Sequence, residues 1–273
     1  MKIFSPQTAF SHVENEIIHA INRDPLTFLN HNLVDYGKKI SCSKSAISRL
    51  VKLLNFSSLH QMKLFVQQQL LLHNFYYDIN QNQTISWRIN NIKSYNNFAI
   101  NKTIEAIDLH NLQQIVNQLA QAARFHIFGV GSSYLAAYEL TNNLLKINFS
   151  VSCSQDIHNT ILVLANWSTN DFLILFSKSA TTKEIAFLIT TARQRGIKLL
   201  VITANEALTS QPDCWVIHHK DLQKDFRIIA TSSKVCQLMI GDILFYELFF
   251  QNPNNVKQIE NTFVELKKWK NYK

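Results

Sequence analysis

Short apolar runs alternate with segments of helical periodicity in the C-terminal half of this 273-residue chain, and this order constrains the fold more than any other feature. The apolar runs lie at residues 125–128, 149–153, 172–176, 199–203 and 214–217. The segments predicted as helices lie at residues 133–146, 156–166, 181–195 and 232–250. Strands that alternate with helices form a parallel sheet flanked by helices, and such sheets bind ligands at the carboxyl ends of their strands.

The first 75 residues show helical periodicity without such runs. Ser11 and Glu14 have the spacing of a capping box, and a helix ending at Asp24-Pro25 is expected to follow. Further helices are predicted at residues 33–40, 43–54, 59–72 and 104–123. The predicted fold class is therefore an α-helical N-terminal helix-turn-helix domain plus an α/β domain. The predicted boundaries are 1–75 for the first domain, 76–103 for an Asn- and Gln-rich linker, 104–252 for the α/β domain and 253–273 for a basic tail.

Composition excludes several classes of protein. The chain is 47% hydrophobic and 17% charged, which excludes disorder as its main state. Its longest apolar runs fall short of the ~18 residues that a membrane span needs, so we expect no membrane partner. The four cysteines are scattered, without a C-x-x-C motif, and the ten histidines lack metal-ligand spacing. We therefore expect a cytoplasmic protein with no disulfide framework, metal or cofactor.

Basic side chains concentrate at the two ends of the chain. Residues 1–75 hold 8 Lys or Arg against 4 Asp or Glu, and residues 251–273 hold 5 against 2, whereas residues 126–250 hold 10 of each. A basic N-terminal domain is compatible with nucleic acid as a partner. Ordinary solvated lysines explain the excess equally well, so charge alone leaves both interpretations open.

The predicted helix 43–54 divides its side chains between two faces. The apolar face holds Ile47, Leu50, Val51 and Leu54. The polar face holds cations and hydroxyls without a carboxylate: Lys44, Ser45, Ser48, Arg49 and Lys52. A helix in the major groove of DNA needs such a face, because Lys and Arg neutralise phosphates while hydroxyls and guanidinium groups contact base edges. The alternative is a plain helical bundle with a solvated face.

Hydroxyl side chains gather after two of the predicted strands, each time before a helix. Gly129-Val-Gly131-Ser132-Ser133 follows the first strand, and a segment with Ser177, Ser179 and Thr182 follows the third. Free N–H groups at a helix N-terminus, together with hydroxyl donors, suit a phosphate and a sugar. Ser233 adds a hydroxyl at the start of the long helix 232–250. A single cluster of this kind is often only a helix cap. The dinucleotide fingerprint G-x-G-x-x-G fails at Tyr134.

Residues 125–245 resemble a SIS (sugar isomerase) domain. The resemblance is carried by 129–133 (GVGSS), 176–184 (FSKSATTKE), 192–203 (ARQRGIKLLVIT) and 233–245 (SKVCQLMIGDILF). Residues 10–73 resemble the DNA-binding domain of RpiR-type bacterial transcriptional regulators through 43–49 (SKSAISR) and 54–56 (LNF). The resemblance implies a homodimer or homotetramer that binds double-stranded operator DNA and senses a phosphorylated sugar. It implies effector contacts from Gly131, Ser132, Ser133, Ser177, Ser179, Thr182 and Ser233, and no catalytic residue.

The chain departs from the family pattern at several positions. Ala180 stands where glycine is usual in the second loop, and a positive φ there would cost about 1 kcal/mol. Asn55 also replaces a usual glycine, but Asn tolerates the left-handed conformation. Ala46 replaces a usual Thr, and Lys234 stands where Arg is common.

Two rival functions stay open at the sequence level. The first is a phosphosugar isomerase with an accessory helical domain, in which Glu139, His158 and Glu184 are the acid and base candidates. Their spacing is not diagnostic, and each has an ordinary structural role to fill. The second is a regulator that has lost effector binding through Ala180.

Overall fold

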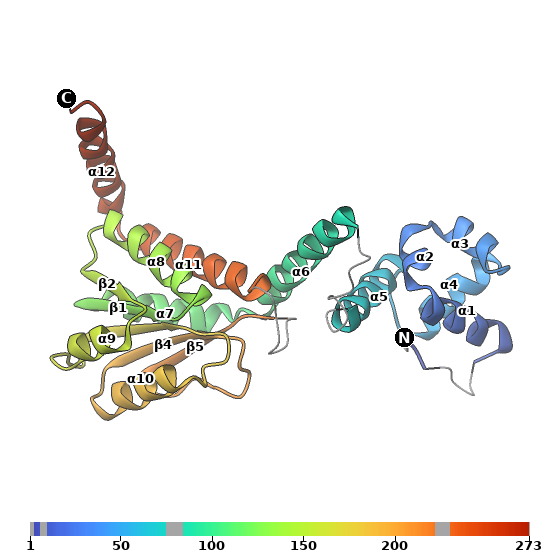
Figure 1. Ribbon diagram of the computed structural model, residues 1–273, viewed down its shortest axis with the longest axis horizontal. Helices are drawn as coiled ribbons and strands as arrows, with labels where there is room; N and C mark the ends of the chain where they lie inside the picture. The colour runs from blue at the N-terminus through green and yellow to red at the C-terminus, as the bar shows by residue number, and fades with distance from the viewer. Residues whose placement is uncertain (1–2, 6–9, 75–83, 222–229, 273) are drawn as a thin grey trace. The chain divides into compact units, whose positions relative to one another are not determined.

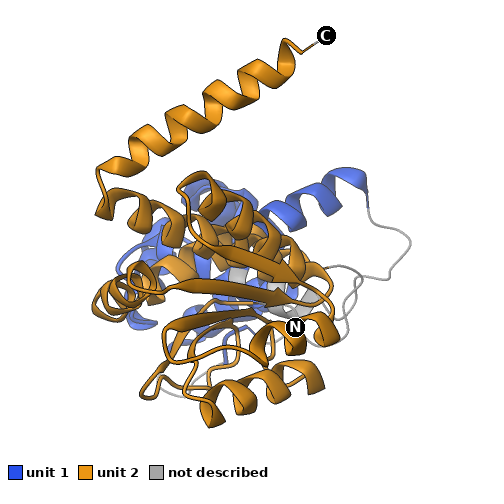
Figure 2. Ribbon diagram, turned by 90° about the vertical axis from the view of Figure 1, so that its left-hand side faces the viewer, with its two compact units in different colours: residues 1–94 blue, residues 95–273 orange. Residues whose placement is uncertain are grey.

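The computed structural model of the protein describes residues 3–5, 10–74, 84–221 and 230–272. The chain forms two compact units, Met1–Ser94 and Tyr95–Lys273 (Figure 2).

The described part of the N-terminal unit is helical. Its helices are α1 (His12–Arg23), α2 (Pro25–Asn30), α3 (Leu33–Lys39), α4 (Lys44–Leu53), α5 (Leu59–Asn74) and the beginning of α6 (Ile85–Ala106). The predicted capping box is confirmed, since the Ser11 hydroxyl accepts from the Glu14 N–H and Glu14 accepts from the Ser11 N–H. The prediction missed α2, in which Asp24 caps the helix and Pro25 opens it. Proline suits the first helical position because it has no N–H to leave unpaired.

A helix fills much of the segment that the sequence analysis treats as a linker. The second half of α6 lies in the C-terminal unit, where Tyr95, Ala99 and Thr103 are buried. The prediction of one helix over 104–123 is wrong, because α6 ends at Ala106 and α7 spans Leu109–Ala120. Asp108 causes the break, since its carboxylate accepts from the backbone N–H groups of His110 and Asn111 and caps a new helix.

A five-stranded sheet forms the centre of the C-terminal unit. Its strands are β1 (Arg124–Gly129), β2 (Val151–Ser154), β3 (Asp171–Phe176), β4 (Lys198–Thr203) and β5 (Cys214–His218). The spatial order is β2-β1-β3-β4-β5, and every neighbouring pair is parallel. The predicted fold class, helices followed by an α/β domain with a parallel sheet, is confirmed.

Helices cover both faces of the sheet. They are α7, α8 (Ser132–Lys146) and α11 (Ser232–Gln251) on one face, and α9 (Ile157–Leu164) and α10 (Lys183–Gln194) on the other (Figure 1). Strand β3 contributes side chains to the two hydrophobic cores, one on each face of the sheet. Phe172 and Ile174 pack with α7, α8 and α11, whereas Leu173 and Leu175 pack with α9 and α10. This alternation follows from the two-residue period of a strand, and it explains why β3 is apolar throughout.

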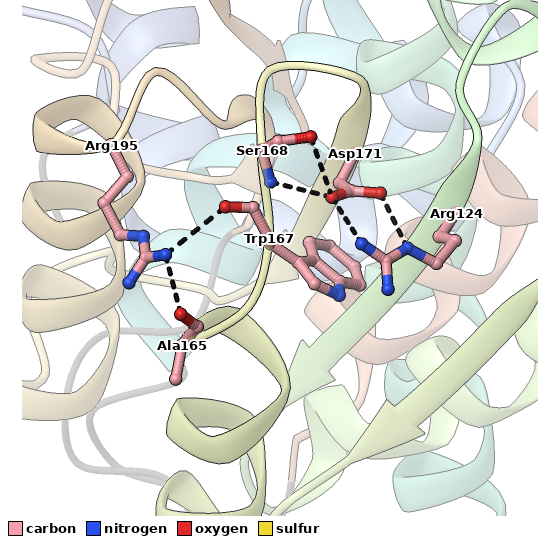
Figure 3. A network of polar contacts seen from close by, with 6 residues as sticks. All are labelled: Arg124, Ala165, Trp167, Ser168, Asp171 and Arg195. Carbon is pink, nitrogen blue, oxygen red and sulfur yellow. Dashed lines mark hydrogen bonds and ion pairs between the residues drawn. The ribbon is translucent and has the colours of Figure 1, made fainter.

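Polar contacts stabilise the amino edge of the sheet, where strands β1 and β3 begin (Figure 3). Arg124 at the start of β1 donates from Nε and Nη2 to the two carboxylate oxygens of Asp171 at the start of β3, both at 2.8 Å. The Ser168 N–H donates to the same carboxylate. Burial alone raises the pKa of Asp171, but the hydrogen bonds from Arg124 and Ser168 outweigh it and hold the pKa below its usual value. This edge is structural, and it lies away from the strand ends where ligands bind.

A final helix, α12 (Asn254–Lys270), occupies most of the segment predicted as a basic tail. It extends away from the sheet and its covering helices in both ribbon views (Figures 1 and 2). Within the described residues, none of the helices has the length and apolar character needed to cross a membrane.

Candidate functional site

The carboxyl ends of the parallel strands meet at one edge of the sheet. The chain passes from β1 outward to β2 on one side, and from β3 outward to β4 and β5 on the other. The direction of winding therefore reverses between β1 and β3, and ligands of doubly wound sheets bind at such a switch point. The two hydroxyl-rich loops, 129–133 and 177–182, follow these two strands and flank the switch point.

The first loop needs both of its glycines, for different reasons. A Cβ at Gly129 would lie 2.7 Å from the carbonyl oxygen of Ser133, so the backbone passes too close for any side chain. Gly131 has a φ of 58°, in the left-handed region that favours glycine. It is the N-cap residue of α8, and no side chain caps that helix. The positive end of the helix dipole therefore faces the loop without a capping group. Ser132 is exposed there and Ser133 is half-buried.

The second loop turns sharply after β3. Ala180 has a φ of 53°, the strained conformation that the sequence analysis considers for this position. The buried Ser177 hydroxyl accepts from the Ala180 N–H at 3.1 Å, and the Ser179 hydroxyl accepts from the Thr181 N–H at 3.3 Å. Thr182 is the N-cap residue of α10, but its hydroxyl makes no capping hydrogen bond. Ser177 thus shapes the loop, while the hydroxyls of Ser179 and Thr182 lie nearer the surface.

Strand β4 holds the second loop in place. The Thr203 hydroxyl and the Ala204 N–H both donate to the carbonyl oxygen of Lys178 at 2.9 Å. The Asn205 amide donates to the carbonyl oxygen of Ser179 at 2.9 Å. Sequence reasoning did not single out these supporting residues. A sequence signal was present, because Thr203 ends an apolar strand and Asn205 follows it, and both are polar.

A buried ion pair links the second loop to the start of α11. Lys178 Nζ lies 3.2 Å from Asp221 Oδ2, and the Asp221 side chain is 1% exposed. The Ser232 hydroxyl donates to the other oxygen of Asp221 at 2.6 Å. The predicted effector residue Ser233 is buried next to Ser232. The sequence analysis missed Lys178 and Asp221, since their partnership joins residues 43 positions apart and no local pattern reveals it.

The N-terminal unit presents α4 as the sequence predicts. Ile47, Leu50 and Val51 are buried in the core of that unit. The polar side chains lie outside that core, with Lys44, Ser45, Arg49 and Lys52 exposed and Ser48 half-buried. Ser43 is the N-cap residue, and its hydroxyl accepts from the Ala46 N–H at 3.1 Å.

The turn between α3 and α4 depends on a close backbone approach. A Cβ at Gly37 would lie 2.6 Å from the carbonyl oxygen of Cys42, and the Gly37 carbonyl accepts from the Cys42 N–H. Only a residue without a side chain fits at this position of α3. Asn55 has a φ of 60° directly after α4, a conformation that Asn adopts more readily than most residues.

Arg49 has a second role that the sequence analysis does not include. Its Nε lies 2.7 Å from Glu14 Oε1, whose side chain is 6% exposed, while the Arg49 side chain stays 61% exposed. Hydrogen bonding from the Ser11 backbone, assisted by Arg49, lowers the pKa of Glu14. Arg49 therefore supports the start of α1 and still presents part of its guanidinium group to solvent.

The acid and base candidates occupy ordinary structural positions. Glu139 is exposed on α8 and accepts from the Asn143 amide. His158 is exposed in the first turn of α9, and Glu184 is half-buried in the first turn of α10. The ion pairs and hydrogen bonds between described residues do not join any two of these three side chains. Over the same described residues, no group of His, Cys, Asp and Glu side chains is arranged to hold a metal ion.

Residues 118–246 match the family model of the SIS domain. This stretch contains all five strands of the sheet and both hydroxyl-rich loops.

Relatives extend the similarity to most of the chain. An HTH-type transcriptional regulator of Haemophilus influenzae is 24% identical over 266 residues, covering 93% of this chain and 91% of that protein. The NanR protein of Vibrio vulnificus, solved in complex with ManNAc-6P, covers 98% of this chain and 97% of its own at 18% identity, with a TM-score of 0.59. The sugar isomerase domain of an RpiR transcription factor from Sphaerobacter thermophilus covers 64% of this chain and 96% of its own at 15% identity, with a TM-score of 0.55. These similarities confirm the resemblance to HTH-type transcriptional regulators that have a SIS domain.

Proposed function

We propose that this protein is a DNA-binding transcriptional regulator whose SIS domain senses a phosphorylated sugar. One observation carries the proposal. The same chain holds an exposed cationic helix face without carboxylates on α4 and two hydroxyl-bearing loops that flank the switch point of a parallel sheet. The similarity to HTH-type regulators over most of the chain supports this combination.

The DNA contact comes from α4. Lys44, Arg49 and Lys52 would neutralise phosphates, and Ser45 and Ser48 would contact base edges near the beginning of the helix. A homodimer or homotetramer would place two such helices on the two halves of an operator. A protein in this role works in the cytoplasm, with the DNA that it regulates.

The effector site lies at the carboxyl edge of the sheet. Ser132, Ser133, Ser179 and Thr182 would donate to phosphate and sugar oxygens, and the N-termini of α8 and α10 favour an anion there. Gly131 would let the backbone approach the ligand, while the buried Ser177 and Ser233 would lie beneath it. The neighbouring Lys178 lies at the same edge, where Asp221 offsets its charge. The phosphosugar in the NanR complex belongs to this ligand class.

Effector binding must change the arrangement of the DNA-binding domains to affect transcription. A ligand with equal affinity for two arrangements shifts neither, so the phosphosugar has to bind one of them more tightly.

The alternative function is a phosphosugar isomerase with an accessory helical domain. Incubation of the protein with aldose and ketose phosphates tests it. We expect no turnover. Turnover that is lost in Glu139→Gln or Glu184→Gln variants would favour the isomerase and contradict the regulator.

A regulator that has lost effector binding is the second alternative, because Ala180 is strained. Calorimetric titration with a panel of sugar phosphates decides between the proposed function and this second alternative. Saturable binding supports the proposed function, and heats no larger than dilution across the panel support the alternative.

The DNA contact is tested through its salt dependence. An operator is first selected from genomic fragments, and its affinity is then measured by fluorescence anisotropy at several salt concentrations. We expect Lys52→Ala and Arg49→Ala to weaken binding and to flatten the logarithmic salt slope by about 1 each, because each removes one phosphate contact.

Lys52→Ala is the cleaner of the two variants, since Arg49 also pairs with buried Glu14. Lys146→Ala, an exposed lysine on α8, serves as the matched control and should leave the slope unchanged. A wild-type slope in the Lys52→Ala and Arg49→Ala proteins would refute the assignment of α4 to DNA.

A further inference from the structure

The C-terminal helix α12 has an apolar stripe that its own unit leaves exposed. The stripe consists of Val256, Ile259, Phe263 and Leu266, spaced as in a heptad repeat. Ile259 packs against the core below the helix, whereas Val256, Phe263 and Leu266 are 52%, 66% and 50% exposed. A 17-residue helix is only marginally stable alone in water, and heptad spacing is typical of helices that pack against other helices.

The corner between α11 and α12 keeps this stripe away from its own unit. The buried Asn255 amide donates to the carbonyl oxygens of Leu248 and Phe249, at 3.2 and 3.0 Å, and so caps the end of α11. The Asn252 side chain accepts from the Asn254 N–H across Pro253. These bonds fix the direction in which α12 leaves, and folding back onto its own α11 would break them.

A second apolar surface is exposed on the outer side of α8 and α11, which pack side by side over the sheet (Figure 1). Its members are half-exposed or more: Leu135, Tyr138 and Leu145 on α8, and Tyr246 and Phe250 on α11. We call it the α8–α11 face. Exposed apolar side chains that gather on two packed helices are typical of a surface that another macromolecule covers.

The exposed charged side chains of the α8–α11 face are mainly acidic, and those of α12 are mainly basic, with four lysines against Glu260 and Glu265. The face includes Glu139, Asp242 and Glu247, all exposed. Partial burial raises the pKa of Asp242, and the negative charge of the neighbouring Glu139 raises it further. The last turn of α12 holds Lys267, Lys268 and Lys270.

We propose that α12 of one copy of this chain docks on the α8–α11 face of a second copy, and that the exchange is reciprocal. The apolar stripe of each α12 covers the apolar side chains of the partner's face, and the terminal lysines lie near its carboxylates. Pairing of two α12 helices in parallel is disfavoured, because it would bring the lysines of both copies together.

Carbodiimide cross-linking of the wild-type protein gives the first test, since it joins only amines and carboxylates in direct contact. An equal mixture of ¹⁵N-labelled and unlabelled protein shows by mass which links join different copies. We expect mixed-isotope links from Lys267 or Lys270 to Glu139, Asp242 or Glu247. Links confined to one copy, or links from α12 to α12, would overturn the proposal.

Charge reversal gives the second test, measured as the dimer dissociation constant by sedimentation equilibrium without DNA or sugar. Glu139→Lys with Asp242→Lys, and separately Lys267→Glu with Lys270→Glu, should each weaken the dimer by about tenfold or more. The chain with all four changes should regain most of the wild-type affinity. Glu16→Lys, on α1 of the N-terminal unit, is the control and should change nothing.

Three results would contradict the docking: a wild-type constant in both double variants, failure of the fourfold variant to recover, or weakening by the α12 changes alone. These experiments use neither DNA nor a sugar phosphate. Failure of the proposed function would therefore leave their outcomes unchanged.

Discussion

Single backbone positions set the shape of the candidate effector site. Position 129 requires glycine because the backbone of α8 lies too close for a side chain, and position 131 favours glycine because its φ is positive. Ala180 adopts a positive φ despite its side chain. The sequence carries part of this information, since a chain with only five glycines places them where the backbone demands it. The resemblance to the SIS family pointed to Ala180, because glycine is usual at its position and a positive φ there would strain alanine. The ion pair of Lys178 and Asp221 was not expected, because it depends on how distant segments meet.

The two glycines of the first loop give a prediction at this scale. Gly129→Ala should lower the free energy of unfolding by about 3 kcal/mol, because its Cβ would lie 2.7 Å from the Ser133 carbonyl oxygen and neither backbone segment can yield easily. Gly131→Ala should cost only about 1 kcal/mol, since no heavy atom lies within 4 Å of its Cβ position.

Guanidinium unfolding followed by tryptophan fluorescence measures both values, with Trp167 and Trp215 reporting on the C-terminal unit. Equal costs for the two variants would show that the close approach at Gly129 is relieved by movement of the loop.

Elements with a clear apolar pattern were predictable, and elements without one were not. The strands and helices from Arg124 to Gln251 follow the predicted alternation because each buries an apolar side in one of two cores. Helix α6 was missed as a helix because its Asn- and Gln-rich sequence has little amphipathic pattern before Tyr95. Helix α12 was missed because its exposed stripe is interrupted by lysines and suggested only a basic tail.

The buried face of β1 gives a prediction about pH. His126 on this strand bonds to the hydroxyls of Ser152 and Thr160, and burial lowers its pKa to about 4. The unfolded chain takes up the proton near pH 6.5 and the folded chain only near pH 4, so stability falls as the pH drops between these values. The loss is on the order of 3 kcal/mol. His126→Gln should keep polar contacts in this place and remove that part of the pH dependence.

Unfolding free energies at pH 7 and pH 4.5 measure the effect. Burial also lowers the pKa of His219 to about 4. The His126→Gln variant should therefore keep the part of the pH dependence of stability that His219 contributes. His158→Gln, at an exposed position on α9, should behave like the wild type. If His126→Gln showed the full wild-type pH dependence, the neutral buried state of His126 would be refuted.

At the scale of the whole molecule, the proposed function requires two units to communicate. The proposed DNA-binding face lies in one unit and the proposed effector loops lie in the other. Communication therefore has to pass through a change in how copies or units are arranged, and a ligand can produce it only through unequal affinity for the arrangements. Reciprocal docking of α12 would give each copy a partner against which such a change can act.

Operator affinity as a function of sugar phosphate concentration tests the central claim most directly. A thermal-shift screen with sugar phosphates first identifies the ligand, and anisotropy then measures operator binding with and without it. We predict at least a fivefold change in operator affinity for the wild type at saturating ligand. Ser179→Ala should need about tenfold more ligand for the same change, with unaltered affinity for DNA in its absence. An operator affinity that stays constant at saturating concentrations of every sugar phosphate in the screen would contradict the account.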